Sequence, residues 1–278
     1  MSEVQHFKQL NKYYNFSRWK YNWFLNGSRH FGFYPKKKWI PTEEAQTLMQ
    51  NLVAEKVEAG SGKKLLDAGC GQGVTAIYLA KKYGSFVEGV TMVPYEVEEF
   101  TKIAKNFGVD AKAHATLMDY SHLKFGAEYF DGVYSQESLV HSINLEKTLR
   151  ELYRVLKQGG RAAFFEYSMA DDSKFSKEEL KTLNEMNEAS AMYSFPNMRH
   201  GAFSRLMQNI GFRNVEVEII SEEVGPMIKR YQLFAKPPYF LFKLFGLTKN
   251  MPNLVAAARM VRFGEKDLIR YNIFTAVK

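Results

Sequence analysis

The chain has 278 residues, 46% of them hydrophobic, with a formal net charge of +8, which suits one large α/β domain with insertions or two small domains. Its basic residues are spread along the chain without a zinc-finger spacing or an RNA-binding aromatic motif, and this argues against a nucleic-acid partner. Cys70 is the only cysteine, so an intrachain disulfide and a cysteine-based metal cluster are excluded, no metal is expected, and the cytoplasm is the expected location.

The N-terminal segment differs in composition from the rest. Residues 1–15 lack the apolar stretch of a secretory signal. Residues 13–39 are crowded with aromatic side chains, and residues 42–58 have a polar helical pattern. We expect residues 1–60 to form an N-terminal helical lid with an aromatic inner surface.

From residue 63, short apolar runs alternate with amphipathic segments, a pattern typical of successive βα units on a parallel sheet. Strands are expected at 63–68, 86–91, 110–114, 130–135, 160–167, 212–220 and 271–277. Helices are expected at 73–83, 94–107, 145–157 and 198–210. The fold class predicted for residues 61–278 is α/β, a Rossmann-like seven-stranded sheet with helices on both faces.

Two stretches depart from this alternation, at about 169–197 and 221–269, and both are rich in methionine and aromatic residues. We expect them to be helical insertions that cap one edge of the sheet together with the lid. The most apolar part, residues 231–247, is interrupted by Lys236, Pro237 and Pro238, so it is not expected to span a membrane. Contact with a membrane surface remains open for this segment.

A glycine-rich turn follows the first expected strand. It reads Asp67-Ala68-Gly69-Cys70-Gly71-Gln72-Gly73, where a backbone without Cβ atoms turns tightly and approaches a ligand. The third glycine comes one residue too early for a dinucleotide site, and no Gly-Lys-Ser/Thr follows as in a phosphate-binding loop. The D-x-G-x-G-x-G pattern resembles the first motif of the class I S-adenosylmethionine-dependent methyltransferases. The resemblance implies that S-adenosylmethionine is the cofactor and that Asp67, Gly69, Gly71 and Gly73 hold its methionine part.

Further motifs extend this resemblance. Thr91 stands at the position where most members have an acid for the ribose, as in the branch that includes cyclopropane-fatty-acid, tocopherol and sterol methyltransferases, and Glu96 stands where that branch often has a glutamine over the cofactor. Asp119 and Tyr120 match the adenine-contacting motif. The remaining expected cofactor-binding residues, at the end of the fourth strand, are Ser135 and Gln136.

The segment after the fourth strand carries the candidate catalytic residues. Glu137 and His141 are four residues apart, beyond the carboxyl end of a strand, where open parallel sheets bind ligands. A carboxylate and an imidazole there can act together as general bases, or the carboxylate can stabilise a cationic intermediate. Tyr134, Glu137 and His141 also match the Y-x-x-E-A-T-x-H pattern of sterol C-methyltransferases, which Ser138 and Leu139 interrupt.

The aromatic lid resembles N-terminal elements of the same family. The residues expected to line the substrate pocket are Tyr14, Trp23, His30, Phe31 and Tyr34. The resemblance implies a small, largely apolar acceptor, with C-methylation of a sterol-like, terpenoid-like or other lipid alkene as the first hypothesis. O- or N-methylation of a phenolic or amine molecule is the alternative, and a cofactor-binding regulatory protein without catalysis is a third. The sequence leaves the acceptor, the methylated atom and the oligomeric state open.

Overall fold

The computed structural model describes residues 3–25, 28, 30–35, 38–247 and 252–278. The side chains of residues 3, 16–25, 252, 253 and 256 are not described. The lid residue Trp23 therefore lies outside the described side chains, and its expected place in the pocket stays a prediction.

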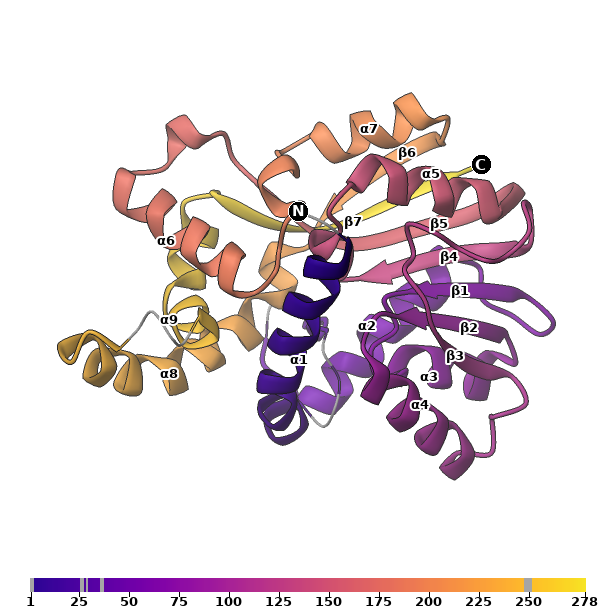
Figure 1. Ribbon diagram of the computed structural model, residues 1–278, viewed down its shortest axis with the longest axis horizontal. Coiled ribbons are helices and arrows are strands. Elements are labelled where there is room, and N and C mark those ends of the chain that lie inside the picture. The colour runs from indigo at the N-terminus through magenta and orange to yellow at the C-terminus, as the bar shows by residue number, and fades with distance from the viewer. Residues whose placement is uncertain (1–2, 26–27, 29, 36–37, 248–251) are drawn as a thin grey trace.

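A mixed sheet of seven strands runs through the described part of the molecule in the order β3-β2-β1-β4-β5-β7-β6 (Figure 1). The strands are β1 (Lys64–Ala68), β2 (Phe86–Thr91), β3 (Ala113–Leu117), β4 (Phe130–Gln136), β5 (Leu156–Met169), β6 (Arg213–Ile219) and β7 (Ile269–Val277). Strands β1 to β5 pair in parallel, and β7 is antiparallel to both β5 and β6. The strand order reverses between β1 and β4, where the carboxyl ends leave a crevice for a ligand.

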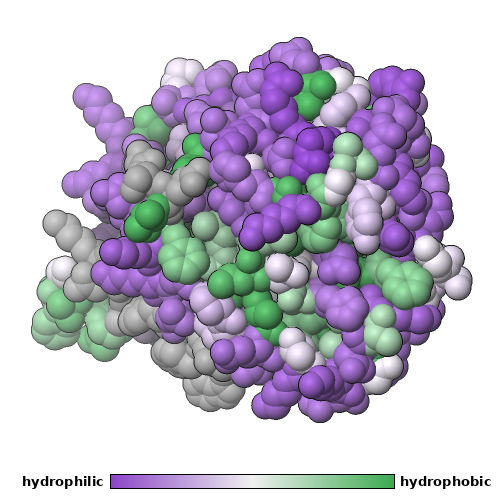
Figure 2. Space-filling model, turned by 45° about the vertical axis from the view of Figure 1, so that its right-hand side comes forward, coloured by the Kyte–Doolittle hydropathy of each residue, from purple (hydrophilic) through white to green (hydrophobic). Residues whose placement is uncertain are grey.

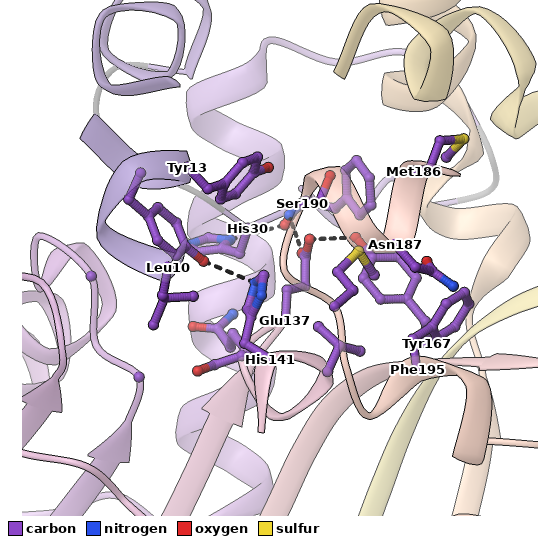
Figure 3. A pocket seen from close by; sticks show the side chains of 18 of the residues that line it. Leu10, Tyr13, His30, Glu137, His141, Tyr167, Met186, Asn187, Ser190 and Phe195 are labelled. Atoms are coloured by element: carbon purple, nitrogen blue, oxygen red, sulfur yellow. Dashed lines mark hydrogen bonds between the residues drawn. The ribbon is translucent and has the colours of Figure 1, made fainter. Parts of the chain in front are cut away.

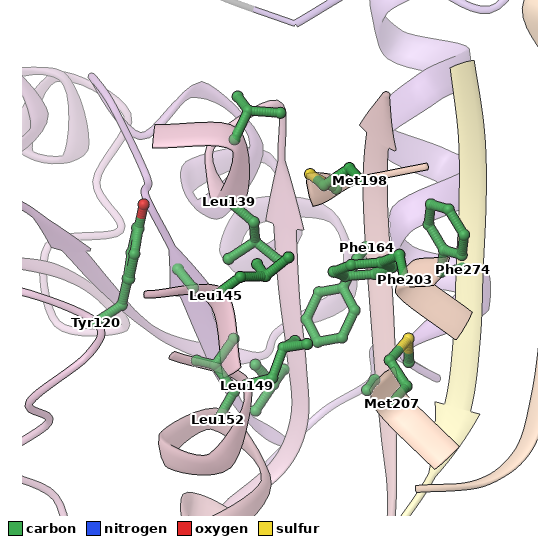
Figure 4. Close-up of a cluster of buried hydrophobic side chains, with 14 of the residues drawn as sticks. Tyr120, Leu139, Leu145, Leu149, Leu152, Phe164, Met198, Phe203, Met207 and Phe274 are labelled. Atoms are coloured by element: carbon green, nitrogen blue, oxygen red, sulfur yellow. The ribbon is translucent and has the colours of Figure 1, made fainter. Parts of the chain in front are cut away.

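Helices cover both faces of this sheet, as the fold class predicts. Two separate hydrophobic clusters form because successive strand residues point to opposite faces; Phe164 and Phe165, both fully buried, lie in different clusters. On one face lie α2 (Thr42–Lys56), α3 (Val74–Tyr83) and α4 (Pro94–Asn106). On the other lie α5 (Leu145–Val155) and α7 (Ala202–Ile210), with the aromatic and methionine core that Figure 4 shows.

The remaining helices form the cap. They are α1 (Glu3–Leu25), α6 (Lys177–Ala189), α8 (Ser221–Leu244) and α9 (Pro252–Glu265). In Figure 1, α6, α8 and α9 lie together at the left, beside α1. Arg259 of α9 donates to Thr182 of α6 at 2.6 Å, and the Lys266 ammonium lies 2.6 Å from Glu179 of α6, so the two predicted insertions support each other. The lid boundary at residue 60 stays a prediction.

Some expected boundaries were wrong. Strand β3 begins at Ala113 instead of 110, because the amides of Lys112 and Ala113 both donate to the Val109 carbonyl in the turn that closes α4. Helix α7 begins at Ala202 instead of 198, since Gly201, with φ 77°, precedes it as the N-cap. Helix α8 runs through Pro237 and Pro238, which the sequence suggested as interruptions. None of the described helices combines the length and hydropathy that crossing a bilayer requires.

Candidate active site

A cavity of about 750 Å³ opens at the carboxyl ends of β1, β2 and β4, beneath the cap (Figure 3). The sheet contributes the glycine turn, the end of β2 and the residues after β4. The cap contributes residues of α1, α6, α8 and α9, most of them apolar. The cavity therefore joins a polar floor on the sheet to an apolar roof under the helices.

The glycine turn forms one wall of the polar floor. Gly69 and Gly71 line the cavity with φ 93° and 53°, conformations that favour glycine. Gly73, which was also expected to hold the cofactor, is the N-cap of α3 and does not line the cavity. A Cβ built on Gly73 would lie 2.0 Å from the Phe100 ring, so the structure gives this glycine a packing role.

Asp67, the penultimate residue of β1, is buried beside this turn and lines the cavity. Burial raises the pKa of Asp67 to about 7, and the neighbouring Tyr134 of β4 opposes the shift. A cation placed next to this group would restore its charge, because an opposite charge favours the ionised form. The ammonium group of a bound S-adenosylmethionine would supply such a cation.

Two expected cofactor-binding residues, Thr91 and Glu96, lie in contact in the structure. Thr91 ends β2, and Glu96 lies in the first turn of α4; both are buried and both line the cavity. The Thr91 hydroxyl donates to Glu96 Oε2 at 2.5 Å. Helix α4 thus places a carboxyl group beside the end of β2, in the wall of the cavity.

Of the other expected cofactor-binding residues, some line the cavity and others lie behind its wall. Tyr120 and Gln136 line the cavity, and the Thr75 hydroxyl donates to Gln136 Oε1 at 2.6 Å. Gln136 Nε2 has no hydrogen-bond partner within the described residues, which leaves a buried donor for a ligand.

Two other expected cofactor-binding residues lie outside the cavity lining. Asp119 does not line the cavity and accepts from the Ser121 amide at 2.7 Å. Ser135 is fully buried behind the wall, where its hydroxyl donates to Glu166 at 3.4 Å.

Glu137 lies at the junction of the floor and the roof. It follows β4 with φ 54°, and its half-buried side chain lines the cavity. Its Oε2 accepts from the Tyr167 hydroxyl at 2.6 Å (Figure 3). Its Oε1 accepts from the Phe31 amide at 2.8 Å and the Tyr271 hydroxyl at 2.9 Å. A carboxylate has about four acceptor positions, so these three donors leave one on Oε2. Burial raises the pKa of Glu137 to about 7, against the effect of these donors.

The sequence interpretation missed two groups that hold this carboxylate. Tyr167 lies on β5 and Tyr271 on β7, and neither was among the expected site residues. It also missed Glu166, a fully buried carboxyl group that accepts from the Ser138 and Leu139 amides at 2.8 and 2.6 Å. Glu166 thereby anchors the loop directly after Glu137, and burial raises its pKa to about 8.

His141 lines the same cavity but belongs to a different hydrogen-bond network. Its Nδ1 lies 3.0 Å from the Ala191 carbonyl, which can only accept, so this nitrogen carries the proton. In a neutral ring Nε2 is then an acceptor, and the Tyr14 hydroxyl of α1 donates to it at 3.0 Å. No hydrogen bond between described atoms joins His141 to Glu137. The two predicted catalytic residues therefore face one cavity without forming a bonded pair, and His141 connects the lid to the cap.

Of the lid residues expected to line the substrate pocket, some line the cavity and one lies in the core. Tyr14, His30 and Phe31 line the cavity, as expected. Tyr34 does not: it is fully buried in the core below α2 and stacks on Trp39 at 5.2 Å. The roof instead uses residues of the insertions, which the sequence identified only as a cap. These residues include Leu183, Met186, Asn187, Ser190, Met192, Phe195, Ile228, Tyr231, Phe234, Ala235, Pro238, Phe242, Leu254, Ala257 and Met260.

The charge of the cavity has one sign. Asp67, Glu96 and Glu137 line it, and its described lining contains neither lysine nor arginine. His30 is neutral, because burial lowers its pKa to about 4. This composition suits a cationic sulfonium cofactor and a cationic reaction intermediate, and an anionic acceptor would meet no lysine or arginine among the described lining residues.

Comparison with known proteins agrees with this geometry. A family model described as a methyltransferase domain matches residues 66–164. An S-adenosyl-L-methionine-dependent Diels-Alderase of Talaromyces variabilis is 28% identical over 86% of this chain and 84% of its own length. Sterol 4-C-methyltransferase of Caenorhabditis elegans is 30% identical over 68% of this chain, which spans 56% of that protein.

Among solved structures, a cyclopropane synthase of Mycobacterium tuberculosis covers 98% of both chains with a TM-score of 0.84 at 14% identity. At this identity the similarity concerns the fold, including the cap. The methyltransferase-domain match contains the glycine turn, the Thr91–Glu96 pair and the segment from Gln136 to His141, which together contribute the floor of the cavity. The chain therefore belongs to the class I S-adenosylmethionine-dependent methyltransferases, enzymes that use this cofactor as the methyl donor.

Proposed function

We propose that this enzyme transfers a methyl group to a carbon atom of a small, uncharged and largely apolar acceptor with a carbon–carbon double bond, such as a sterol-like or terpenoid-like lipid. The observation that carries the proposal is the Glu137 carboxyl group, half-buried in the wall of a largely apolar cavity and held by three donors. A group held in this way is pre-oriented toward a charge that develops beside it.

The floor of the cavity provides for the cofactor. When bound there, S-adenosylmethionine supplies an electrophilic methyl group on a positively charged sulfur. Asp67 and the turn around Gly71 would hold its methionine part, Glu96 with Thr91 would hold the ribose, and Tyr120 would lie against the adenine. The three carboxyl groups of the cavity balance the charge of the sulfonium and ammonium groups.

The residues under the roof act on the acceptor. Attack of the double bond on this methyl group would form a carbon–carbon bond while the sulfur–carbon bond of the cofactor breaks. S-adenosylhomocysteine would leave, and the positive charge would remain on the acceptor as a carbocation. The faces of the Tyr13, Phe31 and Tyr167 rings, all in the cavity lining, can stabilise this cation by cation–π interaction. Glu137 Oε2 then takes the proton from the adjacent carbon, which restores a double bond.

Incubation of the purified enzyme with methyl-labelled cofactor and fractionated lipid and phenolic extracts tests this proposal. A labelled C-methyl product in the lipid fraction supports it. A labelled phenol or amine instead would select the O- or N-methylation alternative, in which the Tyr14–His141 contact is the candidate base. Cofactor binding without any labelled product would leave a regulatory role.

A second reaction class has support from the comparisons. The similar protein of Talaromyces variabilis is named a Diels-Alderase that depends on S-adenosyl-L-methionine. A cycloaddition forms two carbon–carbon bonds within the substrate, so it leaves the mass of the substrate unchanged and consumes no methyl group. Mass spectrometry of the product, together with the amount of S-adenosylhomocysteine formed, distinguishes this reaction from methyl transfer.

A further inference from the structure

Helix α8 presents an apolar face to solvent. Leu233, Phe240 and Leu244 are 71%, 62% and 83% exposed, and their spacing of seven and four residues places them on one side of the helix. Leu241, 55% exposed, and Phe245, 70% exposed, widen this face toward the end of the helix. Hydrophobic side chains also gather at the projecting lower left edge of Figure 2, where α8 and α9 lie in Figure 1. A contiguous apolar surface of this kind marks an interaction site.

The opposite side of the same helix forms part of the cavity roof. Ala235 and Tyr239 are buried against Ala258 of α9, while Pro238 and Phe242 line the cavity. Phe234 belongs to both sides, because it is 61% exposed and also lines the cavity. The exposed apolar face and the apolar interior of the cavity are therefore continuous across one helix.

The charged side chains of this part of α8 are all basic. Residues 224–247 contain no aspartate or glutamate, and Lys229, Lys236 and Lys243 in this stretch are all exposed. Lys236 and Lys243 are seven residues apart, so both lie along the same border of the apolar face. An apolar helix face bordered by lysines has the composition of an interfacial membrane helix, in which the apolar residues enter the acyl boundary and the lysines meet anionic headgroups.

We propose that α8 docks this enzyme on the surface of an anionic membrane, with Leu233, Phe240 and Leu244 entering the lipid and Lys236 and Lys243 contacting the headgroups. The cavity then opens toward the membrane beside Phe234, and an apolar acceptor passes from the bilayer into the cavity without crossing water. Only this last step rests on the proposed function, because docking itself needs no acceptor. A second copy of the chain fits this face less well, since a two-fold contact would bring the same lysines together.

Vesicle flotation of the full chain tests docking without turnover. Phosphatidylcholine vesicles with and without about 30% phosphatidylserine separate the anionic requirement from apolar attraction. The apolar variant is Leu241→Ser with Leu244→Ser, and the charge variant is Lys236→Glu with Lys243→Glu. Their matched controls on the far part of the sheet layer are Phe107→Ser with Leu117→Ser, and Lys102→Glu with Lys105→Glu, all at exposed positions. Binding of S-adenosylhomocysteine verifies that every variant is folded.

We expect the wild-type chain to bind the anionic vesicles, and both α8 variants to bind them at least about tenfold more weakly, while the controls bind like the wild type. Equal losses in the controls, or no loss in the α8 variants, would overturn the proposal. So would a concentration-dependent dimer that the Leu241/Leu244 variant dissociates, in a chain that does not bind vesicles. Failure to methylate any lipid, with vesicle binding intact, would refute the proposed function and leave the docking proposal standing.

Discussion

Replacement of Glu137 by glutamine isolates the charge of this group from its shape. The carboxyl group accepts from the Phe31 amide and the Tyr271 hydroxyl through Oε1 and from the Tyr167 hydroxyl through Oε2. In Glu137→Gln, the amide oxygen can keep the first two contacts, and the new NH₂ group faces the Tyr167 hydroxyl. A phenolic hydroxyl accepts as well as donates, so this contact can reverse its direction. We expect a folded enzyme that has lost about 1 kcal/mol or less from its hydrogen bonds.

The effect on turnover should be much larger. The charge of Glu137 acts on a cation that exists only as the methyl group arrives, so its loss raises the barrier without weakening ground-state binding. General bases and electrostatic stabilisers contribute about a hundredfold or more, which corresponds to about 2.7 kcal/mol of activation free energy. His141→Ala should be milder, because both nitrogens of His141 already bond to Tyr14 and Ala191 and its loss chiefly loosens the lid.

The assay is the turnover of labelled acceptor at saturating cofactor, together with calorimetric binding of S-adenosylhomocysteine. We expect binding to remain and kcat to fall at least about a hundredfold. The wild-type rate should also rise as the pH increases through about 7, where Glu137 loses its proton, and Glu137→Gln should lose this dependence. Near-full activity in Glu137→Gln, in His141→Ala and in the double variant would exclude both residues from the chemistry. A tolerated glutamine alone would favour O- or N-methylation by alignment.

The remaining predictions concern the cofactor floor and the core. Glu96→Ala should weaken S-adenosylhomocysteine binding more than Thr91→Ala in calorimetry, because the carboxylate accepts from the ribose and Thr91 donates to that carboxylate; the reverse order would contradict this role. Gly71→Val should abolish cofactor binding, since φ 53° disfavours a β-branched residue and the side chain would enter the cavity; normal binding would refute the assigned floor. Asp67 has a folded pKa of about 7 against its usual 3.8, so the free energy of unfolding of the cofactor-free enzyme should fall as pH rises from 3.8 to 7, and Asp67→Asn should reduce this slope in denaturant titrations. Phe203→Ala removes a ring packed 4.6 Å from that of Phe274 and should cost about 3–5 kcal/mol of unfolding free energy; a loss below 1 kcal/mol would show a looser core.

Several features followed from the sequence because they depend on neighbouring residues. The alternation of apolar and amphipathic segments predicted the α/β class, and the glycine turn between β1 and α3 predicted where the cofactor floor lies. Glu137 and His141 were expected at the carboxyl end of β4, and both line the cavity there. Each of these inferences uses contacts within a strand, a turn or a βα unit, so short patterns contain the necessary information.

Other features depended on residues that are far apart in the chain. Tyr271 donates to Glu137 across 134 positions, and its place on β7 becomes informative only once β7 lies antiparallel to β5. Tyr34 belongs to the aromatic lid by sequence, yet the packing of α2 encloses it in the core. Helix α8 continues through Pro237 and Pro238, with its inner face buried against α9 and the cavity roof. Local propensity determined which residues could form strands, turns and sites in this protein, whereas long-range packing decided which side chains surround Glu137, because the free energy that orders them comes from burial against distant segments.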